Sequence, residues 1–132
     1  MQSRILYTEG KGHFAEGTID ISDVAPNQIR VASKKTGVCR SDIDMMNGNF
    51  GPLPLNMQGH EGLGEVVEVG AQITDVKVGD YVATRGEPGF ADYYNTPIEN
   101  FVVIPKAEPK YIIEPVACGI NIARSVIDRG LN

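Results

Sequence analysis

Three parts of this 132-residue chain place side chains that can bind a metal beside turns or element ends. Cys39 follows an expected strand, His60 and Glu61 lie between two glycines, and Glu114 precedes a proline at an expected helix start. Zinc binds thiolate, imidazole and carboxylate, and a catalytic zinc keeps one position open beyond its three protein ligands. Spacing alone leaves other interpretations open: a buried small cysteine, a Gly-His-Glu turn, and a glutamate paired with a helix dipole.

The elements that must position these residues are mostly short strands. Fifteen glycines and eight prolines divide the chain into short apolar runs, which is typical of an all-β barrel or sandwich. Helices are expected at 41–47, with Ser41 as N-cap, and at 115–129, where Val116, Ile120, Ala123 and Ile127 form one apolar face. The expected strands are 4–8, 14–21, 28–33, 64–70, 76–83, 90–94 and 101–104.

Composition narrows the class of protein. The length suits a single domain over residues 1–132, and 12 basic against 17 acidic residues give a net charge of −5. Nucleic-acid binding needs a clustered basic face, which is not expected here. The sequence has two cysteines, a start without a signal-peptide pattern, and no apolar run long enough to span a bilayer. These features favour a cytoplasmic protein whose partner is a small molecule rather than nucleic acid or a membrane.

Several motifs together resemble the medium-chain zinc-dependent alcohol, polyol and sugar dehydrogenase family. The resemblance rests on the order and intervals of Thr36-Gly37-Val38-Cys39-Arg40-Ser41-Asp42, the run 59–70 beginning Gly-His-Glu-Gly, the run 76–82, Gly89-Phe90-Ala91-Asp92-Tyr93, and Ile113-Glu114-Pro115-Val116-Ala117. It implies a mainly β, GroES-like catalytic barrel. Residues 114–132 would then be the crossover helix toward a nucleotide-binding domain of Rossmann type that these 132 residues do not include.

The resemblance also implies a metal-ligand set. Cys39, His60 and Glu114 would bind one catalytic zinc, and Glu61 would be a carboxylate that exchanges with water. Asp42 would orient the ring of His60 from behind, as partners of metal-bound histidines do. The family's four-cysteine structural zinc site is not expected, because 85–88 run directly into 89–91.

Three further residues receive roles from the same resemblance. Ser41 would take the proton of a zinc-bound alcohol, and Asp44 stands where the family often has a histidine at the end of the proton relay. Arg40 would face the diphosphate of NAD or NADP, although a solvated turn residue explains it equally well.

The reaction implied is hydride transfer to NAD or NADP from an alkoxide that zinc stabilises as a Lewis acid. The sequence contains no G-x-G-x-x-G turn, so we expect the chain alone to bind zinc without turning over an alcohol. Two alternatives remain: a non-enzymatic GroES-like barrel that binds a partner, and an idle truncated product. Apolar surface near the last helix could also favour a homo-oligomer.

Overall fold

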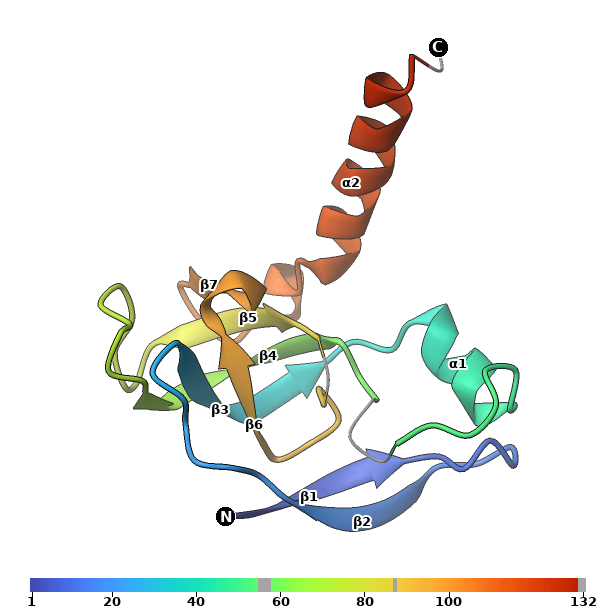
Figure 1. Cartoon of the computed structure of the whole chain (residues 1–132), viewed down its shortest axis with the longest axis horizontal. Helices are drawn as coiled ribbons and strands as arrows, with labels where there is room; N and C mark the ends of the chain where they lie inside the picture. Colours follow the sequence, from blue (N-terminus) through green and yellow to red (C-terminus); the bar gives the residue numbers. More distant parts are fainter. Residues whose placement is uncertain (55–57, 87, 131–132) are drawn as a thin grey trace.

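The computed structural model describes residues 1–54, 58–86 and 88–130 (Figure 1). Within these ranges the chain forms mainly strands, with a short helix in the middle and a longer one at the end. The elements are β1 (Gln2–Tyr7), β2 (Ala15–Asp20), β3 (Gln28–Thr36), α1 (Arg40–Met46), β4 (Glu61–Val69), β5 (Tyr81–Arg85), β6 (Tyr93–Pro97), β7 (Phe101–Ile104) and α2 (Glu114–Asp128). The mainly β expectation is therefore confirmed.

The strands form two antiparallel sheets. β1 and β2 make a hairpin that pairs Gln2 with Asp20, and the other strands form a five-stranded sheet in the order β6-β3-β4-β5-β7. The inner strands of this sheet are β3, β4 and β5, and β3 pairs with β4 so that Thr36 lies opposite Gly62. The end of β3 and the start of β4 therefore lie side by side, just before Cys39 and just after His60.

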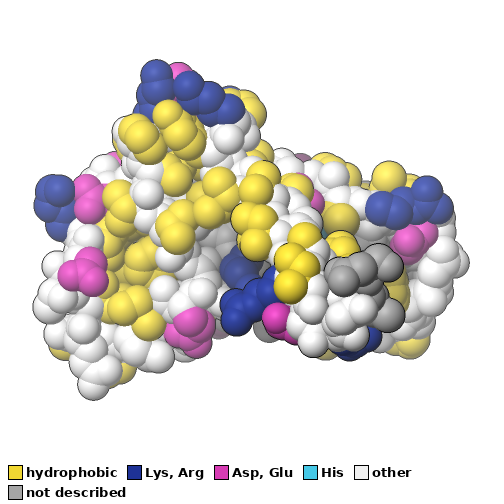
Figure 2. Space-filling view, turned by 90° about the horizontal axis from the view of Figure 1, so that it is seen from above, with side chains coloured by type: hydrophobic (Ala, Val, Ile, Leu, Met, Phe, Trp, Pro, Cys, Tyr) yellow, Lys and Arg dark blue, Asp and Glu magenta, His cyan; other side chains and the backbone are white. Residues whose placement is uncertain are grey.

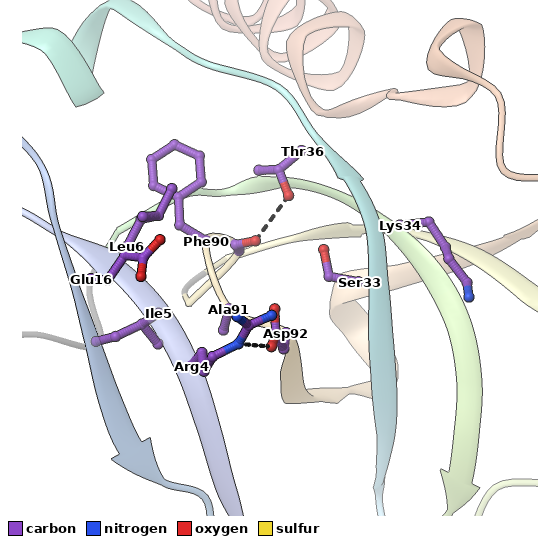
Figure 3. A pocket seen from close by; sticks show the side chains of 11 residues that line it. Arg4, Ile5, Leu6, Glu16, Ser33, Lys34, Thr36, Phe90, Ala91 and Asp92 are labelled. Carbon is purple, nitrogen blue, oxygen red and sulfur yellow. Dashed lines mark hydrogen bonds and ion pairs between the residues drawn. The ribbon is translucent and has the colours of Figure 1, made fainter.

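The segment 89–92 closes the barrel between the two sheets (Figure 3). On one side the amide of Leu6 donates to the carbonyl of Phe90, at 2.9 Å. On the other side the amide of Ser33 donates to the carbonyl of Asp92, at 2.8 Å. An ion pair of 2.7 Å between Arg4 Nε and Asp92 Oδ2 adds a contact across the groove that this segment lines.

The core lies between the sheets, and burial alternates along β1 and β6 as in a half-buried sheet, whereas β3 and β4 contain runs of consecutive buried residues. Ile29, Val31 and Val66 are fully buried, and Tyr94 is buried beside them. The hydroxyl of Tyr94 lies 2.8 Å from Thr84 Oγ1, so the buried phenol has a polar partner. A Cβ at Gly62 would lie 2.5 Å from both of these oxygens, so this position has room only for glycine.

Helix α2 projects away from the barrel (Figure 1). The apolar face expected from the sequence is present but exposed: Val116 is 60%, Ile120 65% and Ile127 72% accessible. Apolar side chains also gather over the face of the molecule seen in Figure 2. No helix in the described part of the chain is long and apolar enough to cross a bilayer.

Several expected boundaries were wrong by a few residues. The predicted strand 90–94 is β6 at Tyr93–Pro97, and the predicted strand 76–83 is β5 at Tyr81–Arg85. Helix α1 begins one residue earlier than expected, so its N-cap is Cys39 and not Ser41. The strand bounds are set by pairing with strands that lie far away in the sequence. The start of α1 is set by the extended backbone of Cys39, which residue type does not reveal.

Candidate metal centre

Cys39, His60 and Glu61 form a cluster that contains two of the three expected ligands, Cys39 and His60, with Glu61 in the place expected for Glu114. Their ligand atoms, a thiol sulfur, an imidazole nitrogen and a carboxylate oxygen, all lie within 4.8 Å of one another. Ligand atoms of one tetrahedral zinc lie about 3.5 Å apart for bonds of 2.0–2.3 Å. Small side-chain movements would therefore bring all three onto one ion.

The β3–β4 ladder positions this cluster. Beyond the Thr36–Gly62 pair, the amide of Gly37 donates to the carbonyl of Glu61 at 2.9 Å, which extends the ladder by one step. A Cβ on Gly37 would collide with the carboxylate of Glu61. The glycine thus leaves the space in which the buried Glu61 side chain lies next to Cys39 and His60.

Cys39 is fixed by the first turn of α1. Its backbone is extended, with φ −94° and ψ 161°, and its amide donates to Asp42 Oδ2 at 2.8 Å. Asp42 is 1% exposed. Its other carboxylate oxygen has no hydrogen-bond partner in the parts of the chain that the structure describes. Its charge helps to raise the pKa of His60, but no hydrogen bond joins it to the ring within the described residues, so the orienting role stays a prediction.

The turn before His60 packs closely against the segment that closes the barrel. Gly59 has a φ of +80°, a conformation that glycine adopts without strain, and a Cβ there would lie 2.5 Å from the amide nitrogen of Phe90. The amide of Gly89 donates to the carbonyl of Gly59 at 2.6 Å. These main-chain contacts of Gly59 with Gly89 and Phe90 hold the backbone just before His60 in place.

Glu114 approaches the imidazole of His60 from the start of α2. Its Oε2 is 4.0 Å from His60 Nε2, and both side chains are largely buried. Its other oxygen accepts a hydrogen bond of 2.9 Å from the thiol of Cys118, one helical turn further on. Glu114 is the first residue of α2, where a carboxylate also favours the positive end of the helix dipole.

The charges of the cluster act on one another. Hydrogen bonds from Ser41 lower the pKa of Cys39 despite its partial burial, and His60 adds to this effect. Burial lowers the pKa of His60, but the hydrogen bond with Cys39 and the charges of Asp42 and Glu114 outweigh it, so the net shift is upward. Burial raises the pKa of Glu61, and the charges of Glu114 and Asp42 add to that. A divalent cation would offset this accumulation of negative charge.

Arg40 and Asp44, two of the predicted site residues, pair with each other and not with the cluster. The guanidinium of Arg40 is 82% exposed and forms an ion pair of 3.3 Å with Asp44 across one turn of α1. Asp44 also accepts a hydrogen bond of 3.3 Å from Asn49. Ser41, by contrast, faces Cys39.

Cys118 is a residue whose place the sequence analysis missed. It is exposed, and its thiol donates a hydrogen bond to Glu114, a contact that the sequence pattern did not lead us to expect. The spacing of four residues between Glu114 and Cys118 was the available signal, because residues at i and i+4 of a helix are neighbours.

The donor set therefore fits a zinc ion. The cluster supplies a thiol whose pKa is lowered, an imidazole and a buried carboxylate, with a second carboxylate close to the imidazole. These are the three ligand types that zinc binds in proteins.

Known proteins resemble the chain over the same residues. Residues 25–106 match the family described as "Alcohol dehydrogenase GroES-like domain". A protein named "Probable quinone oxidoreductase" from Leishmania amazonensis is 34% identical over 97 residues, which are 72% of this chain and 28% of that protein. Sorbitol dehydrogenase 1 of Saccharomyces cerevisiae is 45% identical over 74 residues, 53% of this chain and 20% of that protein.

Solved structures share the fold. The crystal structure of galactitol-1-phosphate dehydrogenase from Escherichia coli superposes with a TM-score of 0.75 at 21% identity, covering 89% of this chain and 43% of that one. The chain spans 20–28% of the length of the first curated relatives. The family match covers more than half of the 132 residues and includes the cluster residues Cys39, His60 and Glu61. The chain therefore belongs to the alcohol dehydrogenase GroES-like domain family of the medium-chain zinc-dependent dehydrogenases.

Proposed function

We propose that this chain carries the catalytic zinc site of an NAD(P)-linked dehydrogenase that oxidises a secondary alcohol, polyol or sugar. The observation that carries the proposal is the convergence of Cys39, His60 and Glu61 within 4.8 Å from the ends of two paired strands. Glu114 supports it as a further carboxylate 4.0 Å from the imidazole. A barrel that served only as a scaffold would have no need for these four side chains together.

The residues of the cluster divide the work of binding the metal. Cys39, His60 and Glu61 supply the three closest donors, and Glu114 supplies an oxygen across the imidazole that can replace Glu61 or water. The charge of Asp42 helps to raise the pKa of His60, and we propose that it makes the imidazole a more basic metal ligand. When bound, zinc supplies a Lewis acid that lowers the pKa of an alcohol hydroxyl.

Ser41 is the group that we propose accepts the proton of the alcohol. Its hydroxyl lies beside Cys39, at the edge of the cluster. Asp44 follows three residues later in α1, so the two side chains are neighbours on the helix surface. We propose that the proton passes from Ser41 to Asp44 and then to solvent, because the Asp44 side chain is partly exposed.

The cofactor would be NAD or NADP, held by a nucleotide-binding domain of the longer protein. The exposed apolar side chains of α2 support the proposal that residues 114–132 cross toward such a domain; Leu131 and Asn132 of that segment lie outside the described residues. We propose that residues 1–132 otherwise form one catalytic domain. The exposed guanidinium of Arg40 is free to turn toward a diphosphate, where a planar cation suits pairs of oxygens.

A polyol or sugar is the proposed substrate class. Glu114-Pro115 is the sequence feature that favours it, and the similarity to a protein named sorbitol dehydrogenase agrees with it. The resemblance to a protein named as a quinone oxidoreductase makes metal binding the property that must be tested first.

The test measures metal content and affinity in the purified chain. We expect one zinc per chain, lost in Cys39→Ala and His60→Ala and retained in Cys118→Ala, which removes the other thiol. We also expect no turnover of sorbitol with NAD or NADP by the chain alone. Unchanged metal content in Cys39→Ala and His60→Ala would overturn the proposal and favour a non-enzymatic binding barrel.

A further inference from the structure

Gln58 is a fully buried polar side chain two residues before His60, with 1% of its surface exposed. Its Oε1 accepts a hydrogen bond of 2.8 Å from the amide of Thr8, and its Nε2 donates one of 3.1 Å to the carbonyl of Thr8. The side-chain amide therefore satisfies both main-chain groups of one residue, as a neighbouring strand would.

Thr8, to which Gln58 is bonded, is itself buried and held by hydrogen bonds. It directly follows β1, is 4% exposed, and its hydroxyl donates to the carbonyl of His13 at 2.7 Å and accepts from the amide of Gly10 at 3.1 Å. Thr8 thus belongs to the turn that joins β1 to β2. Through Gln58 this turn is connected to the segment that carries His60.

The same segment is attached on its other side to 89–90. The carbonyl of Gln58 accepts from the amide of Phe90 at 3.1 Å, next to the Gly89–Gly59 hydrogen bond. The amide of Leu6 in β1 donates to the carbonyl of Phe90, so both attachments lead to the same hairpin. The segment 58–60 is therefore held between the β1–β2 hairpin and the segment 89–92.

These attachments matter because His60 follows a glycine. Gly59, at φ +80°, has the widest choice of backbone conformations, so it does little to fix the direction of the next residue. The position of the imidazole must therefore be set by contacts on both sides of Gly59. Gln58 supplies the contacts on the near side, and the pairing of β4 supplies those on the far side.

We propose that Gln58 is a positioning residue of the metal centre, which holds the 58–60 segment so that the imidazole of His60 stays within reach of Cys39 and Glu61. This inference rests on the proposed zinc site. An apolar side chain at this position would leave the amide and carbonyl of Thr8 buried without partners, and the segment would shift to satisfy them.

The experiment compares Gln58→Met with Gln28→Met. Methionine keeps the length of the side chain and removes the amide. Gln28 is a matched control because its Oε1 also accepts a main-chain hydrogen bond, from Ala25 at 3.1 Å, at the opposite end of β3 from Cys39. Zinc affinity is measured by competition with a chromophoric chelator, and the geometry of the centre by the visible absorption of the cobalt(II) form.

For Gln58→Met we expect zinc affinity to fall about 10-fold, the size of effect known for residues that orient metal ligands, with a changed cobalt spectrum. Gln28→Met should keep both properties of the wild type even if its thermal midpoint falls. A Gln58→Met protein that folds and matches the wild type in affinity and spectrum would overturn the proposal.

If Gln58→Met does not unfold cooperatively, Gln58→Glu decides, because it keeps the side-chain length and the acceptor for the amide of Thr8. Weaker zinc binding with a changed cobalt spectrum in this variant supports the proposal, and wild-type values refute it. A wild-type chain that binds neither metal would instead overturn the proposed function, and the role of Gln58 with it.

Discussion

The thiol of Cys118 donates a hydrogen bond of 2.9 Å to one oxygen of Glu114, while the other oxygen of that carboxylate lies 4.0 Å from His60. Cys39 belongs to the cluster and Cys118 contacts it through Glu114, and the two thiols have opposite electrostatic settings. Glu114 raises the pKa of Cys118, whereas Ser41 lowers the pKa of Cys39.

This contrast predicts the order in which the two thiols react. In metal-free protein near neutral pH, iodoacetamide should modify Cys39 faster than Cys118, because the thiolate is the nucleophile, although Cys118 is the more exposed. Zinc should protect Cys39 and leave Cys118 reactive. Mass spectrometry of labelled peptides measures both rates, with Cys39→Ser and Cys118→Ser as single-thiol controls. Equal protection of the two thiols by zinc would contradict this assignment of ligands.

The two carboxylates near His60 should differ in importance. Glu61 shares the 4.8 Å cluster, whereas Glu114 approaches only the imidazole. Glu61→Gln should therefore weaken zinc binding more than Glu114→Gln, with losses on the order of 10-fold to 100-fold. Chelator competition at fixed pH gives both affinities, and Glu108→Gln, a surface glutamate paired with Lys106, is the control. The reverse order would make Glu114 the principal carboxylate ligand.

Gly37 provides a steric test of the same site. A Cβ at this position would collide with the carboxylate of Glu61, so Gly37→Ala should displace that side chain and weaken zinc binding about 10-fold. Gly119→Ala is the matched control. No atom lies within 4 Å of its added Cβ, and alanine in a helix should raise stability by up to about 1 kcal/mol. Zinc binding that stays unchanged in Gly37→Ala would show that Glu61 is dispensable.

Tyr94 predicts an alkaline dependence of stability. Burial raises its pKa to about 12, although the hydrogen bond with Thr84 opposes this. In the unfolded chain the phenol has a pKa of about 10. The native state therefore keeps the proton where the unfolded state has lost it. The stabilisation is complete below about pH 10 and is lost as the pH rises toward about 12.

Urea unfolding of the wild type and Tyr94→Phe at several pH values measures this effect. We expect Tyr94→Phe to cost about 1 kcal/mol at neutral pH, through the lost hydrogen bond. Its stability should then fall less than that of the wild type between pH 10 and 12. Tyr93→Phe, in the neighbouring position of β6, should follow the wild type. If the free energy of unfolding fell equally with pH in the wild type and in Tyr94→Phe, the raised pKa of Tyr94 would be refuted.

Much of the fold could be predicted because it depends on local patterns. The strand at 101–104 was predicted with its observed bounds, and both helices were predicted within one residue at each end. The boundary between the segment 89–92 and β6 could not be predicted from the sequence, which placed one strand at 90–94. The start of β6 depends on its pairing with β3, whereas 89–91 pair instead with β1, more than 80 residues away.

The candidate site was only partly predictable. Cys39, His60 and Glu61 were named from a resemblance, and their approach follows from the register of β3 on β4, which no local pattern specifies. Gln58 received no role, because its contacts are with the main chain of Thr8, fifty residues earlier. A hydrogen bond to the main chain can be made with any residue type at position 8, so the sequence does not reveal it.

The candidate metal centre lies at one end of the paired inner strands β3 and β4, where Thr36 meets Gly62. Inner strands hold the most protected amide protons of a domain, and helices with few tertiary contacts exchange fastest. If the centre binds metal as proposed, its occupancy would be linked to these inner strands, whereas fraying of α2 would leave the thiol and imidazole donors in place. Deuterium uptake near Thr36 and Gly62 would report zinc release over hours, long after the exposed turns of α2 had exchanged completely.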